Sequence, residues 1–254
     1  MTSSIAFSFV ALFCYLLLAL VQAAPDGRIV GGSLAKKGQF PYQISLKRKG
    51  KHICGGSIIS KNYILTAGHC VLDSYANFEI FQVSVLEVHA GSIHIKKGGV
   101  KIPVAQIIKH PDYCKNKTYY NYDDLALLRL GKPLTFSKTI QPIPLYDGDT
   151  LEGTPVALSG WGQLQPNGAH PTELQWIVLK STSAKDCYWP KKLICLAHSK
   201  NEGACHGDSG GPGVAYGRLV GVASIIKGNC ASDKPDAFVK VARYIDWIKD
   251  NSDA

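Results

Sequence analysis

Residues 204–212 read Ala-Cys-His-Gly-Asp-Ser-Gly-Gly-Pro, a stretch that places Ser209 among glycines. Glycine reaches backbone conformations that other residues rarely adopt, so this composition permits a tight, strained turn. In such a turn the backbone N–H groups of Gly207 and Ser209 can converge beside the serine hydroxyl. Two convergent N–H donors next to a hydroxyl form an oxyanion hole beside a nucleophile. The stretch therefore predicts nucleophilic catalysis by Ser209.

A histidine and a carboxylate precede this turn in the order that such a nucleophile needs. His69 ends the stretch Leu-Thr-Ala-Gly-His at 65–69, and a neutral imidazole is a natural general base near neutral pH. Asp123 and Asp124 stand at the start of an apolar run, and a buried carboxylate needs a partner such as an imidazole N–H. Each pattern alone favours a structural role. Their order before Ser209 favours a catalytic triad.

The composition is that of a globular, turn-rich protein. The 254 residues include 25 Gly and 13 Pro, which excludes a coiled coil, and a 46% share of hydrophobic residues excludes a disordered chain. Short β-branched and aromatic runs between turn signals predict an all-β sandwich or barrel. One amphipathic helix is expected at the C-terminus, where Val241, Ile245 and Ile248 follow helical spacing. The proline-rich stretch 131–148 is the best candidate for a connection between two halves, with a boundary near 131–150.

The N-terminus predicts secretion. Residues 5–23 form an apolar run that ends at a small residue, Ala23, which is typical of a signal peptide over 1–23. An N-terminal membrane anchor is the alternative, but the run is short for a bilayer span and no basic stop-transfer cluster follows it. Eight cysteines also favour an oxidising, extracellular compartment.

A spacer over 24–28 separates this segment from Ile29. Arg28 stands directly before Ile-Val-Gly-Gly, so a trypsin-like protease could cut there and free the α-amino group of Ile29. By itself, this pattern favours an ordinary surface arginine.

Three further motifs extend the pattern over the chain, namely Ile29–Gly32 (IVGG), His52–Ser57 (HICGGS) and Ser159–Gly162 (SGWG). With them the sequence resembles the chymotrypsin-fold, trypsin-like serine proteases from Arg28 to the C-terminal helix. The resemblance implies an all-β fold of two six-stranded antiparallel β-barrels, with the active site in the cleft between them and a helix at the C-terminus. It also implies one protease domain over 29–254.

The family pattern assigns the catalytic roles. His69 corresponds to the general base, Asp124 rather than Asp123 to the orienting carboxylate, and Ser209 to the nucleophile. The oxyanion hole falls on the N–H groups of Gly207 and Ser209. The function expected from the resemblance is that of a serine endopeptidase, which hydrolyses peptide bonds through an acyl-enzyme.

The resemblance also gives Arg28 a role. In the family, the freed amino group, here that of Ile29, pairs with the aspartate before the nucleophile, here Asp208. A buried pair that lacks one partner costs about 3–5 kcal/mol, so an uncut chain would leave the Gly207 amide misformed. We therefore expect a zymogen that an activating trypsin-like protease cuts after Arg28.

The specificity pocket departs from the trypsin pattern. Gly203 occupies the pocket base, where trypsins have Asp, whereas Asp236 occupies a wall position that is usually Gly. This exchange resembles that of crustacean collagenolytic serine proteases and favours a mixed specificity that includes basic side chains. On the substrate-edge strand Ser224 is typical, but Ile226 should narrow the pocket mouth, as in elastase-like members. Small or medium aliphatic, basic and large aromatic preferences stay open, and Asp236 also fits a structural carboxylate satisfied by backbone or water.

The resemblance implies three disulfides, Cys54–Cys70, Cys187–Cys195 and Cys205–Cys230. It leaves Cys114 over, so we expect a monomer unless Cys114 forms an intermolecular bridge. The sequon at Asn116 predicts N-glycosylation.

Cofactors are not expected. Many family members bind calcium through an acidic loop, but the corresponding stretch 89–97 lacks carboxylates, so no metal site is expected. Peptide or protein substrates, the activating protease and inhibitor proteins are the expected partners, with no nucleic acid and no membrane span. The formal charge of +9 favours solvated lysines over an anion-binding patch. The rival function is that of a poorly active protease homologue that acts as a basic binding or antimicrobial protein.

Overall fold

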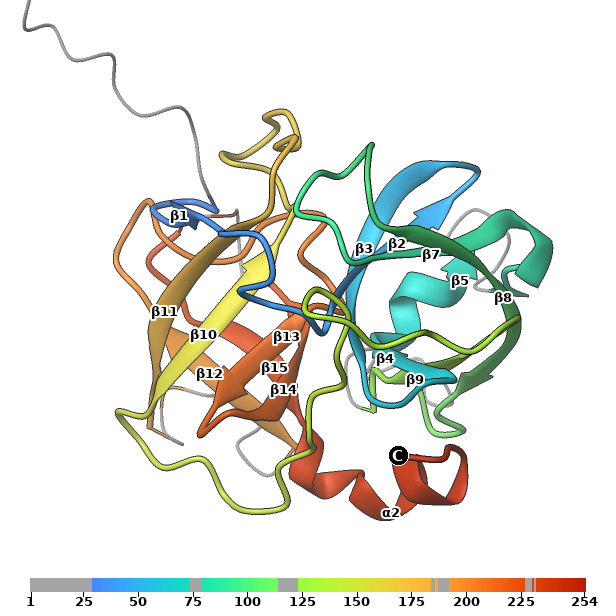
Figure 1. Ribbon diagram of the computed structural model, residues 1–254. Helices are drawn as coiled ribbons and strands as arrows, with labels where there is room; N and C mark the ends of the chain where they lie inside the picture. Colours follow the sequence, from blue (N-terminus) through green and yellow to red (C-terminus); the bar gives the residue numbers. More distant parts are fainter. Residues whose placement is uncertain are drawn as a thin grey trace, which may run out of the picture.

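The computed structural model describes residues 29–73, 79–113, 123–183, 186, 192–226, 230 and 232–254. Two β-barrels lie side by side in it, and the C-terminal helix lies at the lower edge of the view in Figure 1. The predicted signal peptide, the spacer with Arg28, and the residues Cys114, Asn116 and Cys187 lie outside the described residues.

The first barrel closes in the order β2-β3-β4-β9-β8-β7, and its neighbouring strands are antiparallel. Its strands are β2 (Gln43–Arg48), β3 (Lys51–Ile58), β4 (Tyr63–Thr66), β7 (Leu86–Ala90), β8 (Val100–Lys109) and β9 (Ala126–Leu130). Apolar side chains such as Ile44, Ile64 and Leu127 are fully buried in it. Removal of this apolar surface from water is the main driving force for closure.

The second barrel closes in the order β11-β10-β13-β14-β15-β12, because β12 also pairs with β11. Its strands are β10 (Pro155–Gly160), β11 (Gln175–Ser181), β12 (Leu193–Ala197), β13 (Pro212–Ala215), β14 (Arg218–Ile225) and β15 (Asp236–Lys240). The short strand β1 (Ser33–Leu34) pairs with β11 outside this ring. Val156, Leu158, Leu196 and Phe238 form much of the interior. The prediction of two six-stranded antiparallel barrels is confirmed.

Short elements complete the described fold. They are η1 (Gly68–Val71), β5 (Leu72–Asp73), β6 (Glu79–Ile80), η2 (Val83–Val85), η3 (Val241–Arg243) and α2 (Ile245–Asp250). The expected C-terminal helix is thus present, but it begins at Ile245 because Val241 belongs to the preceding 3-10 turn. Val241 and Ile248 are fully buried, as helical spacing predicted. No helix within the described ranges is long and apolar enough to cross a membrane.

The two barrels meet along a seam of backbone. Gly55 of β3 donates its N–H to the carbonyl of Ser209 at 2.8 Å. A Cβ atom on Gly55 would lie 2.8 Å from the Cα of Gly211, and one on Gly210 would lie 2.7 Å from the carbonyl oxygen of Gly55. Side chains at these glycines would therefore push the barrels apart.

Gly210→Ala tests this seam against a matched control. Gly210 has φ +76° in a crowded place, whereas Gly217 has φ +67° and a Cβ added to it would meet nothing within 4 Å. We expect Gly217→Ala to cost about 1–2 kcal/mol of unfolding free energy, since only the left-handed backbone is strained. Gly210→Ala should cost about 1–3 kcal/mol more because it adds overlap. Urea unfolding of both variants in a Ser209→Ala background measures the difference, and equal costs would contradict a tight seam.

Candidate active site

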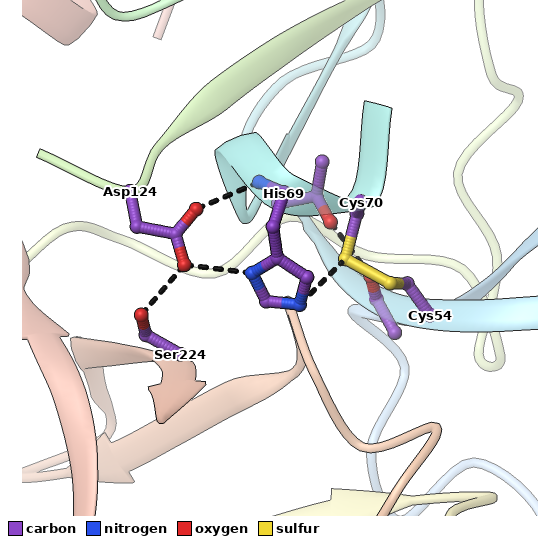
Figure 2. Close-up of polar contacts among 7 residues, drawn as sticks. Cys54, His69, Cys70, Asp124 and Ser224 are labelled. Atoms are coloured by element: carbon purple, nitrogen blue, oxygen red, sulfur yellow. Dashed lines mark hydrogen bonds and ion pairs between the residues drawn. A yellow bond between two sulfur atoms is a disulfide. The ribbon is translucent and has the colours of Figure 1, made fainter. Parts of the chain in front are cut away.

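Half-buried His69 and buried Asp124 form a bonded pair in the first barrel. His69 lies in the η1 turn after β4, and its ring Nδ1 is 2.7 Å from Asp124 Oδ2. Its backbone N–H donates to Asp124 Oδ1, also at 2.7 Å. The carboxylate therefore fixes both the ring and the main chain of His69, as Figure 2 shows. Because a carboxylate can only accept, Nδ1 carries a proton, which leaves Nε2 unprotonated in the neutral ring.

A residue of the second barrel completes the surroundings of this carboxylate. Ser224 at the end of β14 donates its Oγ–H to Asp124 Oδ2 at 2.6 Å (Figure 2). The sequence pattern placed Ser224 on the substrate-edge strand but gave no sign of this bond. The Asp124 side chain is only 1% exposed, so this third donor offsets part of the cost of burying its charge.

The pair shifts the titration of both partners. Burial disfavours the charged form of His69, but the charge and the hydrogen bond of Asp124 outweigh it and raise the His69 pKa above its usual value. Burial likewise opposes ionisation of Asp124, and the charge and hydrogen bonds of His69, with the bond from Ser224, lower the Asp124 pKa. The carboxylate is therefore ionised at neutral pH.

A disulfide adjoins the imidazole. Cys54 and Cys70 are bonded, and Cys70 Sγ lies 3.8 Å from His69 Nε2 (Figure 2). These three residues are the only cluster of potential metal ligands within the described ranges. Since both sulfurs are in the disulfide, neither offers the thiolate that a metal would need.

The turn that carries Ser209 lies at the seam. Gly207 and Gly210, on either side of it, have φ +102° and +76°. Ser209 is half-buried, and within the described residues neither its Oγ nor the N–H groups of Gly207 and Ser209 make a hydrogen bond. Both amides and the hydroxyl are therefore free to contact a bound molecule.

Aromatic rings hold the carbonyl side of Gly207. His52 Nε2 is 3.0 Å from the Gly207 carbonyl oxygen, and His52 Nδ1 is 2.8 Å from Ser45 Oγ. Burial lowers the His52 pKa to about 4, so the ring is neutral at pH 7 and donates from Nε2. His170 packs behind, since a Cβ on Gly207 would lie 2.6 Å from its Cε1. This support of the Gly207 peptide was not predicted from the sequence.

Asp208 points away from the Ser209 hydroxyl into the second barrel. Its carboxylate accepts N–H bonds from Gly162 at 2.8 Å and from Cys205 at 2.9 Å. Burial raises the Asp208 pKa to about 7 despite these two bonds. The Ile29 side chain, only 1% exposed, lines the same small cavity as Asp208. The two residues that the resemblance pairs are thus neighbours.

Asp123, next to Asp124 in the sequence, has a separate set of partners. It accepts bonds from Lys192 Nζ at 2.7 and 2.9 Å and from the Tyr244 hydroxyl at 2.8 Å. Its backbone has φ +60°, a conformation that aspartate tolerates better than most residues. The two carboxylates are therefore not interchangeable, and this network ties the start of β9 to the C-terminal segment.

Two of the predicted pocket residues, Gly203 and Asp236, are in contact, whereas Ser224 is bonded to Asp124. Asp236 is 3% exposed and accepts the Ala204 N–H at 2.7 Å. A Cβ on Gly203 would lie 2.7 Å from Asp236 Oδ2, so the carboxylate lies against the glycine. Ile226 packs on Cys205 and Cys230, which are bonded to each other. Cys195 is also in a disulfide, but its expected partner Cys187 lies outside the described residues.

Comparisons with known proteins agree with this architecture. The sequence model of a family described as Trypsin matches residues 29–248. The chain is 37% identical to Trypsin alpha-4 of Lucilia cuprina, with 94% of this chain and 96% of the relative aligned. It is 38% identical to Chymotrypsin-2 of Vespa crabro, over 88% of this chain and 99% of the relative. It is 40% identical to Trypsin alpha of Drosophila melanogaster, over 88% of this chain and 87% of the relative.

The His69 pKa tests the geometry of the pair without reference to any reaction. We expect a ring titration above 6.5 in the intact protein, because the Asp124 charge favours the imidazolium. Asp124→Asn should lower this pKa, since the attraction is lost while burial remains. Asp149→Asn, which removes an exposed carboxylate paired with Lys240, is the control and should leave it unchanged. NMR titration of the histidine ring protons measures all three; equal His69 pKa values in the first two proteins would contradict the assignment.

Proposed function

The chain belongs to the trypsin family and is a serine endopeptidase, and from that premise we propose that it is secreted as a zymogen that is activated by cleavage after Arg28. The observation that carries the catalytic role is the bonded His69–Asp124 pair at the seam where the Ser209 turn meets the first barrel. The observation that carries activation is that Ile29, which follows Arg28, lines the same small cavity as Asp208. The apolar run over 1–23 supports secretion, and 24–28 is the proposed propeptide. The mature domain is then 29–254, with its halves joined near 131–150.

In the proposed mechanism His69 is the general base. Its Nε2 takes the proton of Ser209 Oγ as that oxygen attacks the carbonyl carbon of the scissile peptide bond. Asp124 keeps the proton of Nδ1 in place and stabilises the imidazolium that forms. His69 then protonates the leaving amine, and an acyl-enzyme remains on Ser209. Water, activated by the same imidazole, hydrolyses the acyl-enzyme.

The oxyanion hole is proposed at the N–H groups of Gly207 and Ser209. Two observations support it: both amides lack a partner among the described residues, and the Gly207 carbonyl is held on the opposite side by His52. Donors fixed in advance stabilise developing charge without reorganisation at the moment of reaction. The intact pair and the free amides favour hydrolysis over the rival role of a non-catalytic binding protein.

Activation is proposed to act through Asp208. In the uncut chain this carboxylate has two N–H donors and no cation within the described residues, and its pKa is about 7. Cleavage after Arg28 would create an ammonium group on Ile29, which already lies beside Asp208. An ammonium next to a carboxylate lowers the pKa of the carboxyl group. The ion pair would then add a second constraint on the Gly207 peptide, whose carbonyl His52 already holds.

The cleavage site is tested by Arg28→Gln. We expect this variant to stay inactive after treatment with trypsin, because trypsin does not cut after glutamine. Arg28→Lys is the control and should be activated as the wild type is. Labelling of Ser209 by a fluorophosphonate probe and hydrolysis of a mixed peptide library measure activity. Wild-type activity in Arg28→Gln would refute the zymogen proposal.

The proposed ion pair between Asp208 and the Ile29 ammonium is tested by measuring how the stability of the fold depends on pH. A carboxyl whose pKa is raised to about 7 in the folded chain, from its ordinary value of 3.8, binds more protons when folded. The uncut chain should therefore lose stability as pH rises from about 4 to 7. After cleavage the Ile29 ammonium favours the ionised form, and this loss should shrink. Thermal unfolding of Ser209→Ala, cut and uncut, measures it; identical pH profiles would contradict the pairing.

A further inference from the structure

A buried histidine lies behind the pocket base, at a position that no sequence motif marked. His198 follows β12, and its side chain is 1% exposed. Its Nε2 is 3.4 Å from Asp236 Oδ2, and the Asp236 side chain is 4% exposed. On the other side of the ring, Nδ1 is 3.1 Å from the carbonyl oxygen of Ser199. Both ring nitrogens therefore face oxygen atoms that can only accept hydrogen bonds.

This arrangement favours the protonated ring. The Ser199 carbonyl requires a proton on Nδ1, and a neutral ring would then direct its Nε2 lone pair at the Asp236 carboxylate. The imidazolium avoids that repulsion and forms an ion pair. The nearby Asp236 carboxylate raises the His198 pKa against the effect of burial, and the charge of Glu202 acts in the same direction. Buried charges are tolerated when they are paired in this way.

Gly203 provides the space for the pair. A Cβ at this position would lie 2.7 Å from Asp236 Oδ2 and 2.9 Å from His198 Nε2, and the backbone has φ +115°. A side chain such as the aspartate of trypsins would therefore overlap both partners. Asp236 also accepts the Ala204 N–H, so its Oδ2 is bonded from within the protein. At the predicted pocket base the Asp236 carboxylate is therefore contacted by His198 and by the Ala204 N–H.

From this juxtaposition we propose that His198 is a specificity-determining residue, which neutralises Asp236 and makes the pocket select uncharged side chains over Lys and Arg. The inference rests on the proposed catalytic function, because it assigns the pocket of that same site. A substrate ammonium or guanidinium would have to displace His198 from a buried carboxylate. Specificity of this kind arises as much from disfavouring the wrong ligand as from contacts to the right one.

His198→Gln is the direct test. It removes the cation and keeps a side chain of similar length, so Asp236 becomes available to a substrate cation. We expect the ratio of kcat/KM for Arg over Leu before the scissile bond to rise by about tenfold or more. Asp236→Asn should not raise the ratio, and the double variant His198→Gln/Asp236→Asn should cancel the rise. A wild-type preference for Lys or Arg, or an unchanged ratio in folded His198→Gln, would overturn the proposal.

Binding of p-aminobenzamidine, a cationic fluorescent probe, tests the pocket without catalysis. In cleaved Ser209→Ala protein the probe should bind weakly, and the added substitution His198→Gln should tighten binding by about tenfold. Tight binding to the protein that retains His198 would overturn the inference, even if His198→Gln does not fold. Fluorophosphonate labelling of proteins that retain Ser209 separates the two proposals. Failure to label the cleaved wild-type protein, together with the expected tightening of probe binding in His198→Gln, counts against the catalytic mechanism alone. Normal labelling with an unchanged Arg/Leu ratio counts against the role of His198.

Discussion

The burial of the Asp124 carboxylate is the constraint on which the rest of the site depends. A charge with 1% of its side chain exposed must be matched by donors, and here they come from the ring and backbone of His69 and from Ser224. Because Ser224 belongs to the other barrel, the carboxylate is fully satisfied only when the barrels are docked. Docking of the two barrels therefore also stabilises the carboxylate that orients the His69 imidazole.

Other buried acceptors near Asp124 and Ser209 are also matched by hydrogen-bond donors, and each has its own set of partners. Asp123 is bonded to Lys192 and Tyr244, so the chain enters β9 with two adjacent carboxylates held by different partners. The His52 ring holds the carbonyl of Gly207, and Asp208 accepts two backbone N–H groups. In each of these three cases at least one donor comes from a distant part of the sequence. The turn around Ser209 is thus held from several sides, while the Ser209 hydroxyl and the N–H groups of Gly207 and Ser209 make no hydrogen bond within the described residues.

The sequence alone was sufficient for the barrels, because the Ser209 turn and the motifs around Ile29 and His52 identify a family with a known fold. It was less informative where a buried group needed a partner. Asp236 could be recognised as a carboxylate in need of compensation, but nothing in the spacing pointed to His198, which reaches it only when β12 pairs with β15. The bond from Ser224 to Asp124 could not be predicted either, because the two residues meet only when the barrels are docked. The expected helix included Val241, whereas α2 begins at Ile245, because residue spacing alone does not distinguish a 3-10 turn from an α-helix.

The seam between the barrels has a consequence for how such a chain can diverge. Besides the side-chain bond from Ser224 to Asp124, the barrels approach each other through backbone at Gly55, Gly210 and Gly211, where an added Cβ would overlap its neighbours. At these three positions divergence is restricted by the approach of one barrel to the other, because any atom added to a glycine there would collide with the facing chain or its own turn.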